Sequence, residues 1–339
     1  MEISVIKKYD RSNMLNLLLK FPQHCLEGYN FDIPKIEREF DKIIFTGMGG
    51  SAIAGDILKV IIEDFIEIPV FVIRDYNLPK FVNSKSMVFI ESYSGNTEET
   101  LSAYKVAKRK GAFLISVSSN GALEKISHQD GITFIKIPSG MPPRCALGYL
   151  LFPVYKILSK NKILPDLEKE FFHKIENWVK EFSPKKADNK AIQLAKKFYK
   201  KVPIIYSENR FYPGILRWKT QIAENSKQFC FVNVLPEMNH NEIMSFTYPE
   251  WFIEKIEVFF IISKIENERI KKRIDITSEI ISQKIKKEVL KVELKGDKII
   301  EKLLYLIILG DWTSFYLAIL NKVDPTEIKE IDILKERLK

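Results

Sequence analysis

Short apolar runs, rich in β-branched and aromatic residues, recur through the first half of the chain, and most of them end in turn-forming residues. The runs are Lys42–Thr46, Val70–Arg74, Met87–Glu91, Phe113–Val117 and Thr133–Ile137. Helical patterns such as Ala52–Ile62 and Glu98–Lys110 lie between some of them. Strands that alternate with helices indicate βαβ units with a parallel sheet, and nearly continuous apolar strands indicate that helices cover both faces. The first half is therefore predicted to be an α/β sandwich.

The second half repeats this alternation after a helical stretch with lysine-rich faces. Helices are predicted over Leu164–Phe182 and Lys190–Lys201, and strands over Pro203–Ser207, Phe229–Leu235, Val258–Ser263 and Leu290–Leu294. Helical patterns separate most of these strands as well. We therefore expect an α/β fold with two tandem domains, residues 1–160 and 161–339. Each is expected to be a doubly wound parallel sheet between layers of helices.

Composition and charge narrow the class of protein. The 339 residues carry a net charge of +9, with 46% hydrophobic and 29% charged residues, as in a globular protein with a sizeable core. Lysine alternates with glutamate and forms no basic stripe, which favours solvated helix faces over a nucleic-acid groove and is compatible with an anionic substrate. The most apolar stretch contains Glu301, Lys302 and Asp311, so it is predicted to be a buried helix rather than a membrane span. The polar start of the chain lacks the apolar stretch of a signal peptide, and we expect a cytoplasmic protein without a membrane partner.

Cysteine and histidine are few and scattered. The cysteines are Cys25, Cys145 and Cys230, and the histidines are His24, His128, His173 and His240. Their spacing fits neither a disulfide framework nor a zinc site. The sequence therefore predicts chemistry without a metal centre.

The first candidate binding motif is Thr46–Ala52, TGMGGSA, between the first strand and a helix. Adjacent glycines there let the backbone approach a ligand and present amide groups to an anion at the helix N-terminus. A P-loop is excluded because Asp56 occupies the place of the essential lysine. The spacing also fits a short dinucleotide-binding fingerprint, with Asp75 placed to bind a ribose, and a tight turn without ligand is the third alternative.

The second motif, Glu91–Thr100, follows the third strand and reads ESYSGNTEET. Its hydroxyl side chains are Ser92, Ser94 and Thr97. Together with the flexible Gly95 and a helix N-terminus, these hydroxyls form a cradle suited to one phosphate dianion. The alternative is a simple capping box made by Asn96 and Glu99; both can hold at once.

The two motifs are expected to meet. In a doubly wound sheet of strand order 2-1-3-4-5, strands 1 and 3 are neighbours whose connections leave in opposite directions, which opens a ligand crevice between them. A hydroxyl-rich nest after strand 3 favours a sugar phosphate over a nicotinamide cofactor. The predicted phosphate-binding residues are Gly49, Gly50, Ser51, Ser92, Ser94 and Thr97.

These motifs carry a resemblance. GMGGSAIAGD and ESYSGNTEET look like the two signature loops of SIS (sugar isomerase) domains. The segments Pro142–Arg144, Glu224–Lys227, Pro236–Glu242 and Ile331–Lys335 are similar to those of the bifunctional phosphoglucose/phosphomannose isomerases of archaea and bacteria. The match covers nearly the whole chain. It implies two tandem SIS domains with flavodoxin-like topology.

The resemblance also implies an activity and residue roles. Members of this family interconvert fructose 6-phosphate with glucose 6-phosphate and mannose 6-phosphate, through a cis-enediol and without metal or cofactor. By this resemblance Glu224 is the base, His240 opens the sugar ring from the neighbouring subunit of a homodimer, and Arg144 stabilises the enediolate. Lys335 would assist ring opening or contact a substrate oxygen. The expected role lies in carbohydrate metabolism, in glycolysis and gluconeogenesis.

Without the resemblance, these side chains have ordinary explanations. A helical glutamate such as Glu224 is usually a solvated surface residue, a loop histidine is usually a bystander, and a terminal lysine usually frays. The runner-up function is a phosphosugar-sensing SIS protein without catalysis. A dinucleotide-dependent dehydrogenase is a further alternative.

Overall fold

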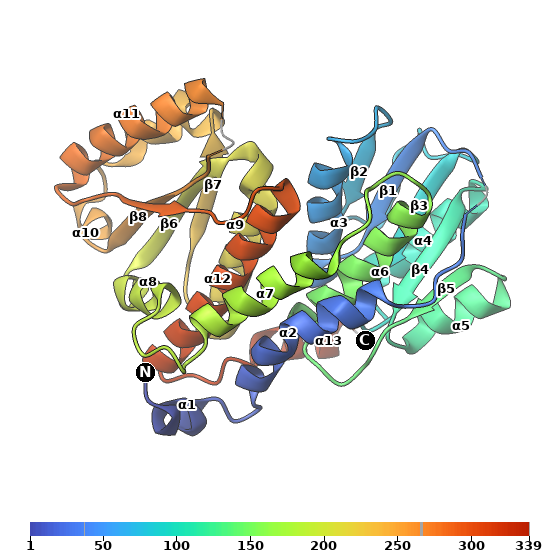
Figure 1. The fold of residues 1–339 in the computed structure, drawn as a ribbon, viewed down its shortest axis with the longest axis horizontal. Helices are drawn as coiled ribbons and strands as arrows, with labels where there is room; N and C mark the ends of the chain where they lie inside the picture. The colour runs from blue at the N-terminus through green and yellow to red at the C-terminus, as the bar shows by residue number, and fades with distance from the viewer. Residues whose placement is uncertain (37, 265–266, 339) are drawn as a thin grey trace. The chain divides into compact units, whose positions relative to one another are not determined.

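The structure, a computed structural model, describes residues 1–36, 38–264 and 267–338. It forms two compact units, each with its own parallel sheet (Figure 1). One unit is residues 20–174, and the other joins residues 1–19 to residues 175–339. The chain passes from one unit to the other within helix α2 (Met14–Tyr29) and again within helix α7 (Lys169–Phe182), whereas the expected boundary at residue 160 coincides with the end of helix α6 (Leu147–Lys160). The first helix, α1 (Ile3–Tyr9), belongs to the unit formed mostly by the second half of the chain.

The sheet of the unit 20–174 has the predicted strand order. Its strands are β1 (Lys42–Thr46), β2 (Val70–Ile73), β3 (Ser86–Glu91), β4 (Phe113–Ser118) and β5 (Thr133–Lys136). They are parallel in the order β2-β1-β3-β4-β5. Thr46 pairs with Ile90, so β1 and β3 end together at one edge. All five predicted strands of this half are confirmed, with ends that differ by at most one residue.

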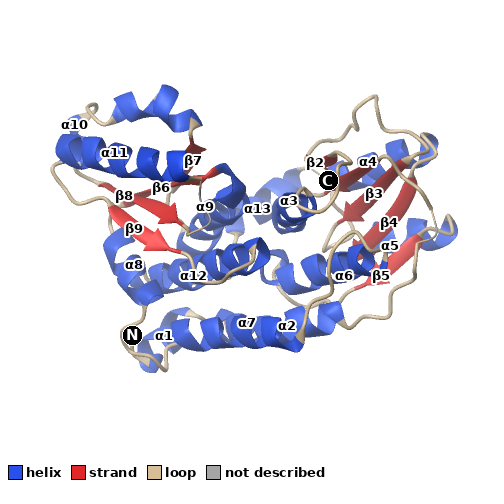
Figure 2. Ribbon diagram, turned by 45° about the horizontal axis from the view of Figure 1, so that its top comes forward, coloured by secondary structure: helices blue, strands red, loops and turns tan. Residues whose placement is uncertain are grey.

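Helices cover both faces of this sheet (Figure 2). The helices of this unit are α3 (Gly49–Ile62), α4 (Glu98–Arg109), α5 (Gly121–Gln129) and α6, and the end of α2 packs on α6. On one face, Val88 and Ile90 pack in a core that includes residues of α4. On the other face, Phe45 stacks on Phe89, and α3 approaches so closely that a Cβ at Gly55 would lie 2.6 Å from the Cβ of Phe45. Successive residues of β3 thus point to opposite faces of the sheet and pack in different cores.

The second unit holds a four-stranded parallel sheet with the matching topology. Its strands are β6 (Val202–Glu208), β7 (Phe231–Leu235), β8 (Ile256–Ile262) and β9 (Leu290–Glu293), in the order β7-β6-β8-β9. The four predicted strands are confirmed. Phe229 and Cys230 were expected to begin the second of them but precede β7, which is an edge strand. One face packs on α11 (Glu268–Ile285), and on the other Phe259 stacks against Phe198 of α8 (Lys190–Phe198).

Helix α12 (Ile299–Leu320) is the centre of this unit. It is long and apolar enough to span a membrane, and 94% of its most apolar window is buried inside the protein. It packs on α9 (Tyr212–Ser226), where the indole Nε1 of Trp218 donates to the carbonyl of Leu306 at 2.7 Å. The charged Glu301, Lys302 and Asp311 are all buried on this helix, as expected for a core helix rather than a lipid-facing one.

Candidate active site

The loop after β1 is open to an anion. Gly49 has a φ of +51°, a left-handed conformation that favours glycine, and a side chain there would meet nothing within 4 Å. Helix α3 begins at this residue, and its N-cap residue Met48 makes no side-chain capping bond. The first amides of a helix lack the usual partner four residues earlier, and of these the Ser51 N–H donates to the Met48 carbonyl at 3.1 Å. This junction therefore offers amide donors where the sequence predicted anion binding.

The loop after β3 arranges its hydroxyls in a small cluster. The Ser92 hydroxyl donates to the Thr97 hydroxyl oxygen at 2.9 Å, and the backbone N–H of Asn96 donates to the Ser94 hydroxyl at 3.3 Å. Ser92 is buried, Thr97 half-buried and Ser94 exposed. Thr97 is the N-cap of α4 and its side chain makes no capping bond. Its hydroxyl hydrogen can therefore be directed to a ligand.

The capping-box alternative for this loop is wrong. The Asn96 side chain accepts a hydrogen bond from the backbone N–H of Ala122 at 2.9 Å, so it braces the start of α5. Gly95 has a φ of +67°, and a Cβ there would lie 1.7 Å from the carbonyl oxygen of Asn120. Only glycine allows this close approach. Contacts with the loop after β4 thus hold the nest in shape.

The structure brings Arg144 to the same edge of the sheet. A Cβ at Gly50 would lie 3.2 Å from the Pro143 carbonyl oxygen and 3.4 Å from the Arg144 Cα. Arg144 lies in the 3₁₀ turn η1 (Pro143–Cys145) and is buried. The phenol oxygen of Tyr93 accepts a hydrogen bond from the backbone N–H of Met141 at 3.1 Å, which ties the nest to the segment before η1. The predicted phosphate loops and Arg144 therefore lie together in one unit.

Glu91 is a feature that the sequence reading missed. It is the last residue of β3 and only 1% exposed, and neither carboxyl oxygen has a hydrogen-bond partner among the described residues. Burial raises the pKa of this carboxyl well above its usual value. An acid that ends an otherwise apolar strand was visible in the sequence, but its burial was not.

The predicted base lies in the other unit. Glu224 is half-buried near the end of α9. This helix is held to α12 by a row of buried polar side chains spaced four residues apart. Arg217 donates to Asp311 at 2.8 Å, Gln221 donates to Asp311 at 2.9 Å, and Asn225 donates to Ser314 at 2.9 Å. Asn225, the last residue of this row, directly follows Glu224 in the sequence. The row therefore fixes the orientation of the predicted base.

His240 and Lys335 lie on the surface of this same unit. His240 ends the 3₁₀ turn η3 (Glu237–His240) and is exposed. The preceding Asn239 is anchored by a hydrogen bond from its amide to the Thr277 hydroxyl at 2.8 Å. Lys335 is exposed on α13 (Lys329–Arg337). Glu224, His240 and Lys335 thus occupy three separate elements, and their roles stay predictions.

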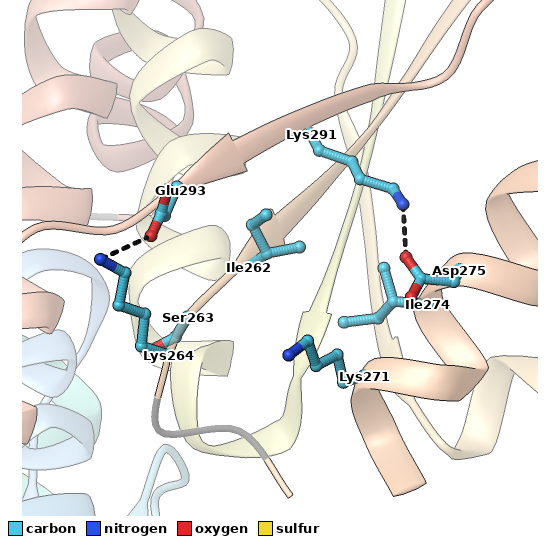
Figure 3. A pocket seen from close by; sticks show the side chains of 8 residues that line it. All are labelled: Ile262, Ser263, Lys264, Lys271, Ile274, Asp275, Lys291 and Glu293. Atoms are coloured by element: carbon cyan, nitrogen blue, oxygen red, sulfur yellow. Dashed lines mark hydrogen bonds and ion pairs between the residues drawn. The ribbon is translucent and has the colours of Figure 1, made fainter. Parts of the chain in front are cut away.

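A surface cavity of about 280 Å³ lies in this unit at the carboxyl ends of β8 and β9. Figure 3 shows its lining: Ile262, Ser263, Lys264, Lys271, Ile274, Asp275, Lys291 and Glu293. Lys291 pairs with Asp275 at 2.6 Å and Lys264 with Glu293 at 3.6 Å. None of the predicted site residues lines it. Across the described residues, no group of three or more His, Cys, Asp or Glu side chains could hold a metal ion.

Comparison with known proteins finds a match for each half of the chain. Residues 38–137 match the SIS domain, and residues 187–338 match the bacterial phospho-glucose isomerase C-terminal SIS domain. The bifunctional phosphoglucose/phosphomannose isomerase of Caldicellulosiruptor bescii is 39% identical, over 92% of this chain and 93% of that protein. That of Thermoplasma acidophilum is 36% identical, over 88% and 90%.

A solved structure shows the same fold at much lower sequence identity. The glucose-6-phosphate isomerase like protein of Thermus thermophilus matches with a TM-score of 0.64 at 16% identity, over 96% of this chain and 97% of that one. Each half of the chain is thus a SIS domain, as expected. Given relatives of this similarity over about nine-tenths of its length, the chain belongs to the bifunctional phosphoglucose/phosphomannose isomerase family.

Proposed function

We propose that this protein interconverts fructose 6-phosphate with glucose 6-phosphate and with mannose 6-phosphate. The observation that carries the proposal is the pairing of two open loop–helix junctions at the ends of β1 and β3, in a chain of this family. Backbone amides from one junction and hydroxyls from the other would hold one phosphate group. Hydrogen bonds to a charged group are about twice as strong as neutral ones, so this anchor can fix the sugar for proton transfer.

The chemistry requires a proton to move between C1 and C2 of the open-chain sugar. We assign the proton transfer to the Glu224 carboxylate. Glu224 is half-buried near the end of α9, where the helix can hold a carboxylate in a defined orientation for proton transfer. Arg144 would stabilise the negative charge on the enediolate oxygens, and its burial strengthens such an interaction. His240 would open the ring, and Lys335 would assist that step or contact a substrate oxygen.

We further propose that the reaction needs no metal. In this route the charge on the enediolate is balanced by Arg144 and by hydrogen-bond donors of the protein. Chelation separates this route from a metal-assisted one, because a Lewis acid that carries this charge would be essential to turnover.

A homodimer with shared sites is part of the proposal, and an exposed aromatic patch supports it. The patch is formed by Phe229, Phe231, Phe252 and Trp251, whose rings contact one another in that order. Phe229 is 77% exposed and Trp251 is 69% exposed. Phe231 is 46% exposed as well, and an apolar patch of this kind is typical of the centre of an interface in which each partner buries roughly 800 Å². The patch borders the free edge of β7, which a second copy would cover.

The deciding experiment uses purified protein and fructose 6-phosphate with excess EDTA, with both aldose phosphates quantified. We expect both products at undiminished rate. Binding of fructose 6-phosphate without turnover would identify the protein as a sensor of phosphosugars instead. Loss of activity on chelation, restored by zinc, would refute the metal-free route while leaving the isomerase assignment in place.

A further inference from the structure

The Glu91 carboxyl is the least explained polar group in the unit 20–174. It is 1% exposed and neither oxygen has a hydrogen-bond partner among the described residues. An ionised carboxylate in such surroundings is very costly, so the group is neutral at ordinary pH. Even a neutral acid loses free energy when its hydrogen-bonding groups stay unpaired. A buried group of this kind calls for a functional explanation.

Its position connects it to both phosphate loops. Glu91 directly precedes Ser92, the first hydroxyl of the nest. A Cβ at Gly47 would lie 2.8 Å from the Glu91 carbonyl oxygen and 3.1 Å from the Ser51 Cβ, so the loop after β1 lies against this strand end. The alternation along β3 puts Glu91 on the same face as Phe89, whose ring stacks on Phe45 under α3. The Glu91 backbone thus lies where the two loops approach one another, and its side chain is buried.

No charged group on the surrounding described elements forms a hydrogen bond with the Glu91 carboxyl. The titratable side chains of α3, η1, α6 and the nest itself are Asp56, Lys59, Arg144, Cys145, Tyr149, Tyr155, Lys156, Lys160 and Tyr93. Asp56 pairs with Arg74, Lys59 with Glu63 and Lys156 with Asp166. The phenol groups of Tyr149 and Tyr155 donate to Glu27 and to the Pro165 carbonyl. Burial is the cause that raises the pKa of the Glu91 carboxyl, with no opposing cation.

We propose that Glu91 makes anion binding at these loops proton-linked: a dianion binds while the Glu91 carboxyl is neutral, and ionisation of Glu91 weakens that binding. The inference rests on the proposed phosphate site and adds a control of it by pH. Its physical basis is repulsion between two negative charges in a water-poor environment. Linkage is reciprocal, so a bound dianion also makes Glu91 hold its proton more tightly.

The test is calorimetric titration with sulfate, a tetrahedral dianion that does not titrate near neutral pH. Binding to wild type, Glu91→Gln and Glu257→Gln is measured at about pH 6 and about pH 9. Glu257 is a matched control because burial also raises its pKa, but it lies at the opposite, amino-terminal end of a strand in the other unit. We expect the sulfate affinity of wild type and of Glu257→Gln to fall between about pH 6 and about pH 9. This fall should exceed the one seen in Glu91→Gln by about fivefold or more.

The outcomes separate this inference from the phosphate site. Equal pH dependence in Glu91→Gln and wild type overturns the linkage, as does wild-type affinity that does not change with pH. In both cases a loss of sulfate binding in Ser94→Ala with Thr97→Ala would keep the phosphate site itself. Wild type that binds no sulfate at about pH 6 refutes the site and the linkage together.

A second readout does not depend on the Gln variant folding. The infrared spectrum of Glu91→Leu is subtracted from that of wild type at neutral pH. The difference should contain the carbonyl band of a protonated carboxylic acid, because leucine replaces the buried acid by an apolar side chain. A difference spectrum without this band would show that Glu91 is ionised in wild type, and it would overturn the proposal.

Discussion

Arg217 and Asp311 form a two-point ion pair inside the unit that carries the predicted base. The Arg217 Nε donates to one carboxylate oxygen of Asp311 at 3.0 Å and its Nη2 donates to the other at 2.8 Å. Both residues are buried, so the pair specifies how α9 lies on α12. Glu224 is seven residues beyond Arg217 on α9, two turns along the helix, and this ion pair therefore helps to set its orientation.

Loss of one partner of this pair should be severe. Asp311→Ala would leave the Arg217 guanidinium buried without its carboxylate, and breaking a buried pair costs about 3–5 kcal/mol. Urea unfolding monitored by circular dichroism measures the loss. Lys291→Ala breaks the ion pair with Asp275, in which the two side chains are 36% and 61% exposed, and should cost less than about 1 kcal/mol. Equal losses in the two variants would mean that the buried pair does not fix α9.

The hydroxyl nest should govern binding more than turnover. Ser94→Ala with Thr97→Ala should raise KM for fructose 6-phosphate strongly, because each lost hydrogen bond to a charged group costs about 1.5–3 kcal/mol. Steady-state kinetics would resolve KM from kcat. Ser84→Ala is the control. It removes an exposed hydroxyl just before the amino-terminal end of β3, away from the nest, and should leave KM unchanged. An unchanged KM in the double variant would place the phosphate elsewhere.

Glu224 and His240 can be separated by the hydrogen they act on. Glu224→Gln should keep phosphate affinity but abolish exchange of the substrate C2 hydrogen with solvent deuterium, since the base is gone. His240→Ala should slow turnover while some exchange persists on the small open-chain fraction. Nuclear magnetic resonance of the substrate in deuterated buffer follows both. Exchange at wild-type rate in Glu224→Gln would assign the base to another residue.

Mixing these two inactive variants tests the shared site. In a heterodimer one site would carry both defects and the other neither, and random pairing puts about half of the dimers in that form. Activity should therefore recover to roughly a quarter of wild type. Proven heterodimers without activity above the separate variants would place His240 and Glu224 of one chain in the same site.

The aromatic patch should control assembly. Trp251→Glu places a charge at the exposed end of the aromatic patch, and a protein interface disfavours a charge among its apolar contacts. Analytical ultracentrifugation should show monomers where wild type forms dimers. Phe65→Glu, at an exposed aromatic site in the other unit, should leave the dimer intact. A Trp251→Glu variant that stays dimeric would move the interface to another surface.

Glu91 should also leave a signature in stability. Its carboxyl binds a proton more tightly in the folded chain than in the unfolded one, because burial raises its folded pKa above the usual 4.5. The folded state then holds the extra proton, so the contribution of Glu91 to the free energy of unfolding falls as pH rises above about 4.5, by about 1.4 kcal/mol per pH unit, until the folded pKa is reached.

Chemical unfolding at several pH values checks this. Glu91→Gln should gain stability relative to wild type as pH rises above about 5, with the slope just given until the folded pKa of Glu91 is reached. Glu39→Gln, which changes an exposed acid in the same unit, should keep the wild-type dependence. Parallel profiles for wild type and Glu91→Gln would contradict a neutral, buried Glu91.

The sequence by itself determined the elements that depend on local pattern. The strands and their parallel arrangement follow from which residues are apolar and from the turns between them, and both loops of the candidate site follow from where those strands end. Errors arose at the ends of elements. Helix α7 begins at Lys169 rather than Leu164, since Pro165 disfavours helix at the residue before it. Phe229 precedes β7 and joins the exposed patch instead.

Tertiary structure decided what each polar side chain does. Asn96 looked like a helix cap, but the distant Ala122 N–H takes its oxygen, and no local pattern could reveal that partner. Arg144 could have been a surface arginine, and packing of η1 against the start of α3 buries it. Glu91 looked like an ordinary strand end, and only the packing of the folded unit removes its carboxyl from water. Burial and partners of side chains arise from contacts between segments far apart in the chain, which is why they appear only in the folded molecule.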